Sequence, residues 1–159
     1  MTMEHPKHMV VVGCLARNEK GEVLLIRHYK RGWEIPQGRV EEGENLMEAL
    51  HREVREETGV EVAPGPLVAV WSKLSPPAAL IFTFLVDYEG GDLRCSDESP
   101  EVGWFSADEA LSLVSLPVNR DRLRSLLDFS GEIVYRSYSS SPYRVESEAM
   151  WGGRAAPEK

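Results

Sequence analysis

One helix with clearly marked ends lies between two sets of strand-like segments, and this order constrains the fold most strongly. Asn45 can cap the N-terminus of that helix, and Glu48 occupies the third helical position of a capping box. Gly59 suits the left-handed conformation that commonly follows a helix C-terminus. These signals predict a helix over residues 46–57.

Apolar runs of strand length lie on both sides of this helix. Residues 9–16 and 23–26 flank a polar, glycine-containing turn at 18–21, which is typical of a β-hairpin. Further features are expected in this order: strands at residues 60–62, 66–71 and 79–86, a second hairpin turn at 89–92, and a strand at 101–105. The segment 32–44 should be a loop, because it contains four chain breakers, Gly32, Pro36, Gly38 and Gly43.

The remaining helices and the domain limits follow from the same patterns. Ser106 and Glu109 form a second capping-box pattern, which predicts a short helix, and a third helix is expected near residues 121–129. Because hairpins connect the strands, the sequence favours an α/β sandwich with a mixed sheet. The 159 residues suit a single domain. We expect its core over about residues 8–129, followed by a C-terminal extension, 130–159, whose end is a loose tail.

The charge balance narrows the choice of ligand. The chain has 26 acidic and 18 basic residues and a formal charge of −8. That excess would repel a long polyanion, so we expect no binding to long nucleic acids. It would also hinder binding of a small phosphorylated ligand, unless a divalent cation lay between protein and phosphate.

Nothing in the sequence indicates a membrane or an export route. The apolar runs fall far short of the roughly 20 residues that a transmembrane helix needs. Residues 1–8 are polar and lack the pattern of a signal peptide. Cys14 and Cys95 are far apart in the sequence and are expected to be reduced thiols. We therefore expect a cytoplasmic protein.

The helix at 46–57 carries three glutamates along the border of its apolar face. Glu53, Glu56 and Glu57 are separated by three or four positions, which places their side chains near one another. They lie in the last turn, where the helix dipole disfavours negative charge. Mg²⁺ prefers a few carboxylates and substrate phosphates as ligands and would supply the missing positive charge. Glutamate-rich helices are also common as solvated surfaces, so the helix alone leaves both interpretations open.

The loop before the helix extends the pattern. Gly38, Glu44 and the run Arg52–Val60 match the complete Nudix box, and the chain therefore resembles the Nudix hydrolases. The resemblance extends through Trp33–Pro36 and Glu101–Phe105 and covers about residues 8–129. It implies the Nudix α/β/α sandwich and Mg²⁺-dependent hydrolysis of a nucleoside diphosphate linked to another group.

The resemblance also implies roles for individual residues. Metal ligands are expected at Glu53, Glu56, Glu57 and the backbone carbonyl of Gly38, with Mg²⁺ as the natural cation and Mn²⁺ as a substitute. Arg52, which can pair with Glu44 or Glu56, is expected to orient a carboxylate. The implied mechanism is attack on phosphorus by an activated water. The carboxylate that accepts the proton is expected to be Glu98 or Glu101.

Contacts with the substrate are predicted around the same loop. Trp33 and Trp71 are candidates to stack on a base, and Arg27 and Arg31 are candidates to bind phosphate or ribose. Gln37 stands where many relatives have glycine, and it also occurs in relatives that act on dinucleoside polyphosphates or triphosphate RNA ends.

The expected substrate is a small nucleotide. A proline at position 76, sixteen residues after the box, is associated with pyrophosphatases for ADP-ribose. ADP-ribose or a nucleotide sugar is therefore the first expectation. Nucleoside triphosphates, including oxidised ones, come second, and dinucleoside polyphosphates or RNA 5′ ends come third. A non-catalytic binding module would be a different use of the same box, and a homodimer aided by residues 133–143 is a further expectation.

Overall fold

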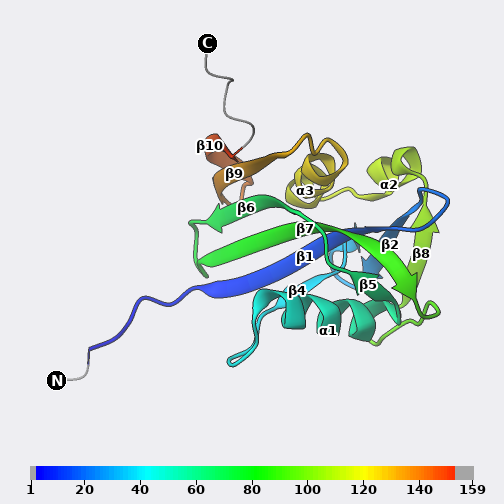
Figure 1. The fold of residues 1–159 in the computed structure, drawn as a ribbon. Coiled ribbons are helices and arrows are strands. Elements are labelled where there is room, and N and C mark those ends of the chain that lie inside the picture. Colours follow the sequence, from blue (N-terminus) through cyan, green and yellow to red (C-terminus); the bar gives the residue numbers. More distant parts are fainter. Residues whose placement is uncertain (1–2, 153–159) are drawn as a thin grey trace, which may run out of the picture.

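The structure is a computed structural model that describes residues 3–152. Within these residues the chain forms ten strands and three helices (Figure 1). They follow in the order β1 (Met9–Arg17), β2 (Val23–His28), β3 (Gly32–Glu34), β4 (Gln37–Arg39), α1 (Leu46–Thr58), β5 (Glu61–Ala63), β6 (Leu67–Lys73), β7 (Ala79–Gly90), β8 (Glu101–Phe105), α2 (Ala107–Leu113), α3 (Pro117–Leu127), β9 (Glu132–Ser139) and β10 (Arg144–Gly152).

The strands form one mixed sheet. Its main order is β10-β9-β6-β7-β1-β2-β3, and β4 pairs with β1, β5 with β7 and β8 with β2. Two pairs are parallel, β1 with β7 and β6 with β9, and the other pairs are antiparallel. The β1–β2 hairpin and the mixed sheet confirm the expectations from the sequence.

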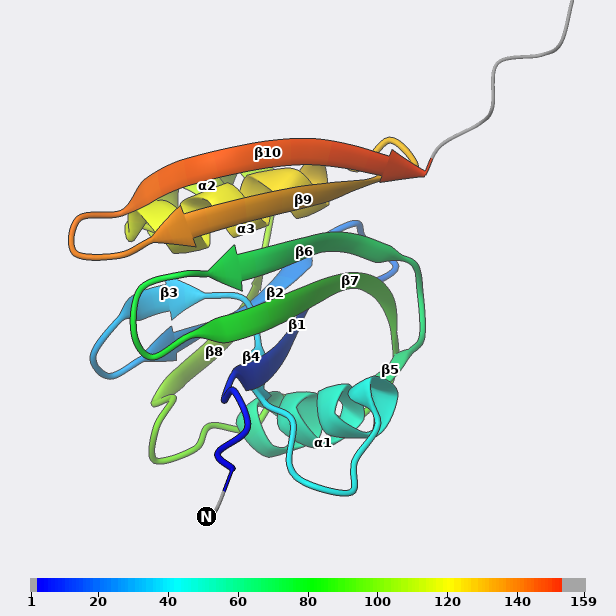
Figure 2. The same ribbon diagram turned by 90° about the vertical axis from the view of Figure 1, so that its left-hand side faces the viewer.

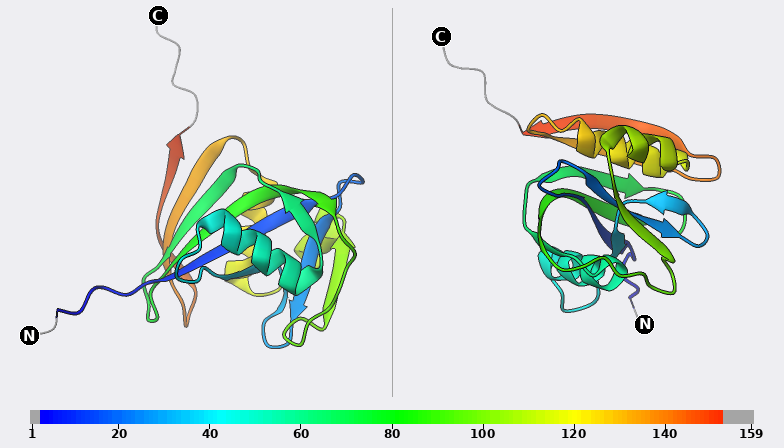
Figure 3. Two further views of the ribbon diagram at one scale, coloured as in Figure 1. Left: turned by 60° about the horizontal axis from the view of Figure 1, so that its bottom comes forward. Right: turned by 90° about the vertical axis from the view of Figure 1, so that its right-hand side faces the viewer.

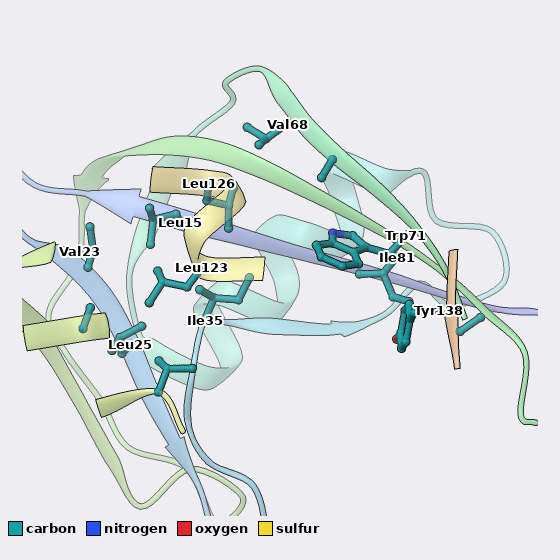
Figure 4. Packing of buried hydrophobic residues seen from close by; sticks show 14 residues of the cluster. Leu15, Val23, Leu25, Ile35, Val68, Trp71, Ile81, Leu123, Leu126 and Tyr138 are labelled. Carbon is teal, nitrogen blue, oxygen red and sulfur yellow. The ribbon is translucent and has the colours of Figure 1, made fainter. Parts of the chain in front are cut away.

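Helices cover both faces of the sheet. α1 lies on one face, and α2 and α3 lie on the other (Figures 1, 2 and 3). One core cluster joins the sheet to α1 through Leu50 and Val54, and the second joins it to α2 and α3. Figure 4 shows the second cluster, in which Leu123 and Leu126 of α3 and Trp71 of β6 all lie in the core. This α/β/α arrangement confirms the predicted fold class.

The ends of α1 are where the capping residues predicted them. The Asn45 side chain accepts from the Glu48 backbone N–H, and the reciprocal bond of the capping box is also present. Gly59 ends the helix with a φ of 80°. Thr58 extends the predicted helix by one residue, and its hydroxyl both donates to Val54 O at 2.6 Å and accepts from Val60 N at 3.1 Å.

The predicted hairpin turn at 89–92 is wrong. β7 continues to Gly90 and pairs there with β5, whereas the next strand, β8, pairs with β2. Gly91 instead lies against the carbonyl of Gly59, where a Cβ atom would overlap it. Gly91 therefore permits close approach of this segment to the end of α1. The loop predicted at 32–44 likewise contains two short strands, β3 and β4.

The C-terminal extension is an integral part of the sheet as far as Gly152. β9 lies parallel to β6, and β10 pairs with β9 at the edge. The end of the predicted tail, 153–159, lies outside the described residues. The helix predicted at 121–129 begins earlier, because Pro117 occupies its first turn, where the missing N–H costs nothing. None of the helices within residues 3–152 is long and apolar enough to cross a bilayer.

Candidate metal centre and active site

Strand β4 places Gly38 directly against a glutamate of α1. A Cβ atom at position 38 would overlap the carboxyl group of Glu53. Gly38 is held there by pairing with Val12 of β1, which lies in the core beneath α1. Only a residue without a side chain leaves room for this carboxylate at the strand.

Glu57 lies one helical turn after Glu53 and is largely buried. Its Oε2 accepts a hydrogen bond of 3.2 Å from the backbone N–H of Gln37. Burial, followed by the charge of Glu53, raises the pKa of Glu57 to about 9. Burial also raises the pKa of Glu53, although a hydrogen bond from Arg52 acts against that shift. These two carboxylates resist being charged together unless a cation is present.

Arg52 holds the surrounding acids in place. Its Nε and Nη2 donate to the two oxygens of Glu44 at 2.7 and 2.8 Å, and its Nη1 donates to Glu53 at 2.9 Å. Nη2 also donates to Arg39 O at 3.0 Å, and Nη1 donates to Glu56 at 3.3 Å. The bidentate contact with Glu44 lowers the pKa of that carboxyl to about 2. Arg52 therefore pairs with both partners considered from the sequence.

Glu56 differs from the other two predicted metal ligands. Its side chain is 60% exposed and turns toward Arg52. Within residues 3–152, no three His, Cys, Asp or Glu side chains converge closely enough to hold a metal ion. Two neighbouring carboxylates with raised pKa values, one of them against a bare glycine, nevertheless suit a hard cation that takes oxygen ligands. The residues thus fit a divalent cation, and the ligand roles of Glu53, Glu56, Glu57 and Gly38 stay predictions.

The two candidate bases, Glu98 and Glu101, lie just before β8 and at its first residue, and β8 pairs with β2. Glu101 is exposed, pairs with Arg27 across the β2–β8 register, and lies 3.4 Å from the Arg27 guanidinium. Glu98 is also exposed, and its backbone carbonyl accepts from Tyr29 N at 3.1 Å. Its charge helps to raise the pKa of Arg31, although a hydrogen bond from Arg31 to Glu34 is the main cause. The choice of base stays a prediction.

The predicted substrate contacts separate into two groups. Arg31 is exposed in the turn between β2 and β3, and Gln37 lies beside Glu57, so both are near the carboxylates. Trp33 is partly buried and packs edge-on against Phe105, with ring centroids 5.0 Å apart. Trp71 is fully buried in the core, so the expectation that it stacks on a base is corrected. It sits on the inner side of β6 because α3 covers that face.

Comparison with known proteins identifies the family. The family model described as the NUDIX domain matches residues 7–128. The chain belongs to the NUDIX domain family. This result confirms the resemblance based on residues 38–60.

Relatives of this Nudix chain include enzymes with different names. A protein of Danio rerio named 8-oxo-dGDP phosphatase NUDT18 is 36% identical over 126 residues, covering 74% of this chain and 37% of that protein. A MutT-like protein of Streptomyces ambofaciens is 35% identical over 127 residues, covering 79% and 81%. The crystal structure of a mutator MutT protein from Bacillus halodurans has a TM-score of 0.75 at 26% identity, covering 89% and 97%. The chain spans only 31–43% of the length of the 8-oxo-dGDP phosphatases that it matches.

The Nudix chain also contains buried polar residues that the sequence patterns did not identify. Glu34 is fully buried and accepts from Arg31 at 2.7 and 2.9 Å and from Asn119 at 2.9 Å. Arg122 is buried as well and donates to Gln37 at 3.3 Å. The sequence did contain a signal for Glu34, because an acidic residue within the apolar run 33–36 indicates a buried carboxylate that needs partners. The sequence of α3 contained no comparable signal for Arg122, since charged side chains are common on the exposed faces of helices.

Two open grooves accompany this Nudix fold. One, of about 370 Å³, lies between α3 and the β9–β10 hairpin, and the other, of about 420 Å³, lies between the start of β1 and the loop at residues 39–44. Within residues 3–152, neither groove is lined by Glu53 or Glu57. The second groove reaches Glu44 and so borders the carboxylate cluster.

Proposed function

We propose that this protein hydrolyses a diphosphate linkage in a small nucleotide-type substrate and uses Mg²⁺ to do so. The observation that carries the proposal is a pair of partly buried carboxylates: Glu53 packs against Gly38, and Glu57, one helical turn later, accepts from the Gln37 N–H. A charged site of this kind suits a cation that also takes phosphate oxygens as ligands. Membership of the NUDIX domain family supports the same reaction class.

Each residue of the site has its own proposed role. Glu53, Glu57 and the Gly38 carbonyl would hold the cation, with Glu56 as a further ligand if it turns away from Arg52. Arg52 orients Glu53 and is itself fixed by Glu44. A bound divalent cation supplies neutralisation of the charge that develops on phosphate oxygens. Glu53 and Glu57 could both be charged in that state, because a cation between them would offset their repulsion.

We infer that a carboxylate outside the α1 cluster accepts the proton of the attacking water. Glu98 and Glu101 are the candidates, and Glu101 is already paired with Arg27. We therefore place Glu98 first as the group that accepts the proton of the attacking water. Arg31, beside Glu98 and Glu57, would bind a phosphate of the substrate.

The names of the relatives favour one substrate class. The proteins named 8-oxo-dGDP phosphatase support an oxidised purine nucleoside diphosphate, which water would cleave to the nucleoside monophosphate and phosphate. ADP-ribose is the second candidate, and the position of Pro76 favours it. Its hydrolysis would give AMP and ribose 5-phosphate.

Product analysis tests both the reaction and the substrate. The purified chain is incubated with MgCl₂ and, separately, 8-oxo-dGDP, 8-oxo-dGTP, dGDP, ADP-ribose, a UDP-sugar and a dinucleoside polyphosphate, and the products are separated by chromatography. We expect Mg²⁺-dependent release of phosphate and 8-oxo-dGMP, with the highest kcat/KM on 8-oxo-dGDP. Hydrolysis of none of these compounds would refute the proposed function, and a preference for ADP-ribose would replace its substrate.

Replacing Arg52 by methionine is expected to lower kcat/KM by about 10–100-fold, because residues that orient metal ligands typically have effects of this size. The substitution removes the donors that hold Glu53 and Glu44. Arg55→Met is the matched control, since Arg55 is exposed on the same helix and pairs with Glu61. Steady-state kinetics with Mg²⁺ should show the loss only in the Arg52 variant, and equal losses in both would contradict the assigned role.

The cellular location and the oligomeric state are also proposals. We place the protein in the cytoplasm, as a single domain that acts on a small nucleotide without a membrane partner. A homodimer also stays a prediction. Gel filtration with light scattering measures it directly.

A further inference from the structure

Helix α3 contacts the segment that leads into Gly38 at two points. Asn119 donates Nδ2 to Oε2 of Glu34 at 2.9 Å, and Arg122, one turn later, donates Nη1 to Oε1 of Gln37 at 3.3 Å. Both donors are almost completely buried, with 5% and 6% of their surface exposed. The segment is therefore held from the face of the sheet that α2 and α3 cover.

The guanidinium of Arg122 has little freedom to move. Its Nη2 donates to the hydroxyl of Tyr138 at 2.6 Å, and its Cζ lies 5.6 Å from the Trp71 ring centroid and 5.7 Å from that of Tyr138. Burial lowers the pKa of Arg122, while the nearby Tyr138 and Glu34 act against this shift. Arginine nevertheless stays protonated in proteins. A buried planar cation fixed at two ends can hold its partners in one orientation.

Gln37 connects this cation to the carboxylates of α1. Its side chain accepts from Arg122, and its backbone N–H donates to Oε2 of Glu57 at 3.2 Å. On β1, Gly13 pairs with Gln37, and a Cβ atom there would lie 3.1 Å from the Cβ of Gln37. The bare glycine thus lets the Gln37 side chain lie close to the sheet. One residue thereby links the two faces of the sandwich.

We propose that Arg122 is a positioning residue that acts through Gln37 on Glu57. Tyr138 fixes Arg122, Arg122 fixes the Gln37 side chain, and the backbone of Gln37 then holds the Glu57 carboxylate in place. We call Tyr138, Arg122 and Gln37 the Arg122 brace. Tyr138 lies on β9, beyond the matched residues 7–128, so the C-terminal hairpin contributes to the active site.

The kinetic effects expected from this inference rest on the proposed function, but its effect on amide exchange at Gln37 does not. Without Arg122, the Gln37 side chain loses its buried donor, and the backbone around it gains freedom. Amide hydrogen exchange at Gln37 should then be faster than in the wild type, whether or not metal or nucleotide is present. The bond from this N–H to Glu57 is the contact that the exchange rate reports.

The first test compares Arg122→Met with the wild-type full chain. We expect faster exchange at the Gln37 amide, a Mn²⁺ dissociation constant raised about tenfold in titrations with MnCl₂ alone, and a kcat that falls more than KM rises. Arg122→Lys should restore part of the Mn²⁺ affinity, since it keeps the charge but lacks the planar fork. Arg124→Met is the matched control, because Arg124 is exposed on the same helix, and it should behave as wild type.

A second variant keeps the test decisive if Arg122→Met does not fold. Gln37→Met removes the side-chain acceptor but keeps the backbone N–H that bonds to Glu57. It should raise the Mn²⁺ dissociation constant as Arg122→Met does, and the double variant should lose no more than the larger single loss, since both act through one contact. If both single variants keep wild-type Mn²⁺ affinity and Gln37 exchange, or if their losses multiply, the brace is refuted.

The outcomes also separate this inference from the proposed function. A wild type that neither binds Mn²⁺ nor hydrolyses any nucleotide refutes the proposed function. The exchange rate at Gln37 still decides whether Arg122 positions that residue. A wild type that is active, with variants that match it in every measurement, refutes the brace alone.

Discussion

Replacing Glu57 by glutamine is expected to lower kcat by about 10³-fold or more, because a bound cation supplies several kcal/mol of charge stabilisation and each 1.4 kcal/mol is tenfold in rate. Glutamine keeps the size of the side chain and can still accept from the Gln37 N–H. It removes the charge that draws the cation into the buried site. Single-turnover kinetics with saturating Mg²⁺ measures the loss, and unchanged activity on every substrate would show that the reaction does not use this carboxylate.

The same substitution should have the opposite effect on the stability of the metal-free protein. The pKa of Glu57 rises from 4.5 to about 9 on folding, so between these values the folded state binds more protons than the unfolded state. Stability therefore falls as pH rises through this window. We expect Glu57→Gln to reduce this fall, so that the variant has the higher Tm at pH 8 without metal.

Magnesium gives the corresponding control. Mg²⁺ should raise the Tm of the wild type more at pH 8 than at pH 6, because protons compete with the cation for Glu57. The variant should show a smaller Mg²⁺ effect and a weaker pH dependence of that effect. Thermal unfolding with and without MgCl₂ measures both, and a Mg²⁺ shift equal in the two proteins at pH 8 would contradict a cation at Glu57.

The features that the sequence predicted well depend on neighbouring residues. The capping box at Asn45 and the left-handed Gly59 fix α1 within a few residues, and the structure confirms both ends. The Arg52–Glu44 pairing lies within the same short stretch of chain. Local hydrogen bonding and backbone geometry decide such features, so a single sequence contains the information.

The features that the sequence did not predict depend on contacts between distant segments. The parallel pairing of β9 with β6 joins residues far apart in the chain, and no local pattern encodes it. An aromatic residue at a strand end suits stacking on a base, but α3 covers the face of the sheet on which Trp71 lies. The bond from Arg122 to Gln37 spans 85 residues. The geometry around Gln37 is therefore visible only in the folded structure.

Replacing Gly38 by alanine is expected to damage the metal site while leaving the fold intact. The added methyl group would overlap the Glu53 carboxyl group, which is the far end of a flexible side chain and can swing away. Displacing this group should weaken Mn²⁺ binding and kcat by about 10–100-fold. The free energy of unfolding should change by less than about 1 kcal/mol, because Gly38 does not need a left-handed backbone.

Two further variants test whether this effect acts through Glu53. Gly90→Ala is the control, since a Cβ atom at that strand position meets open space, and its Mn²⁺ affinity should equal that of the wild type. Combining Gly38→Ala with Glu53→Gln should cost little more than Glu53→Gln alone, because both changes remove the same carboxylate from the site. Additive losses would mean that the methyl group acts elsewhere, for example on the Gly38 carbonyl. Wild-type Mn²⁺ affinity in Gly38→Ala would remove the close contact between Gly38 and Glu53 from the description of the metal centre.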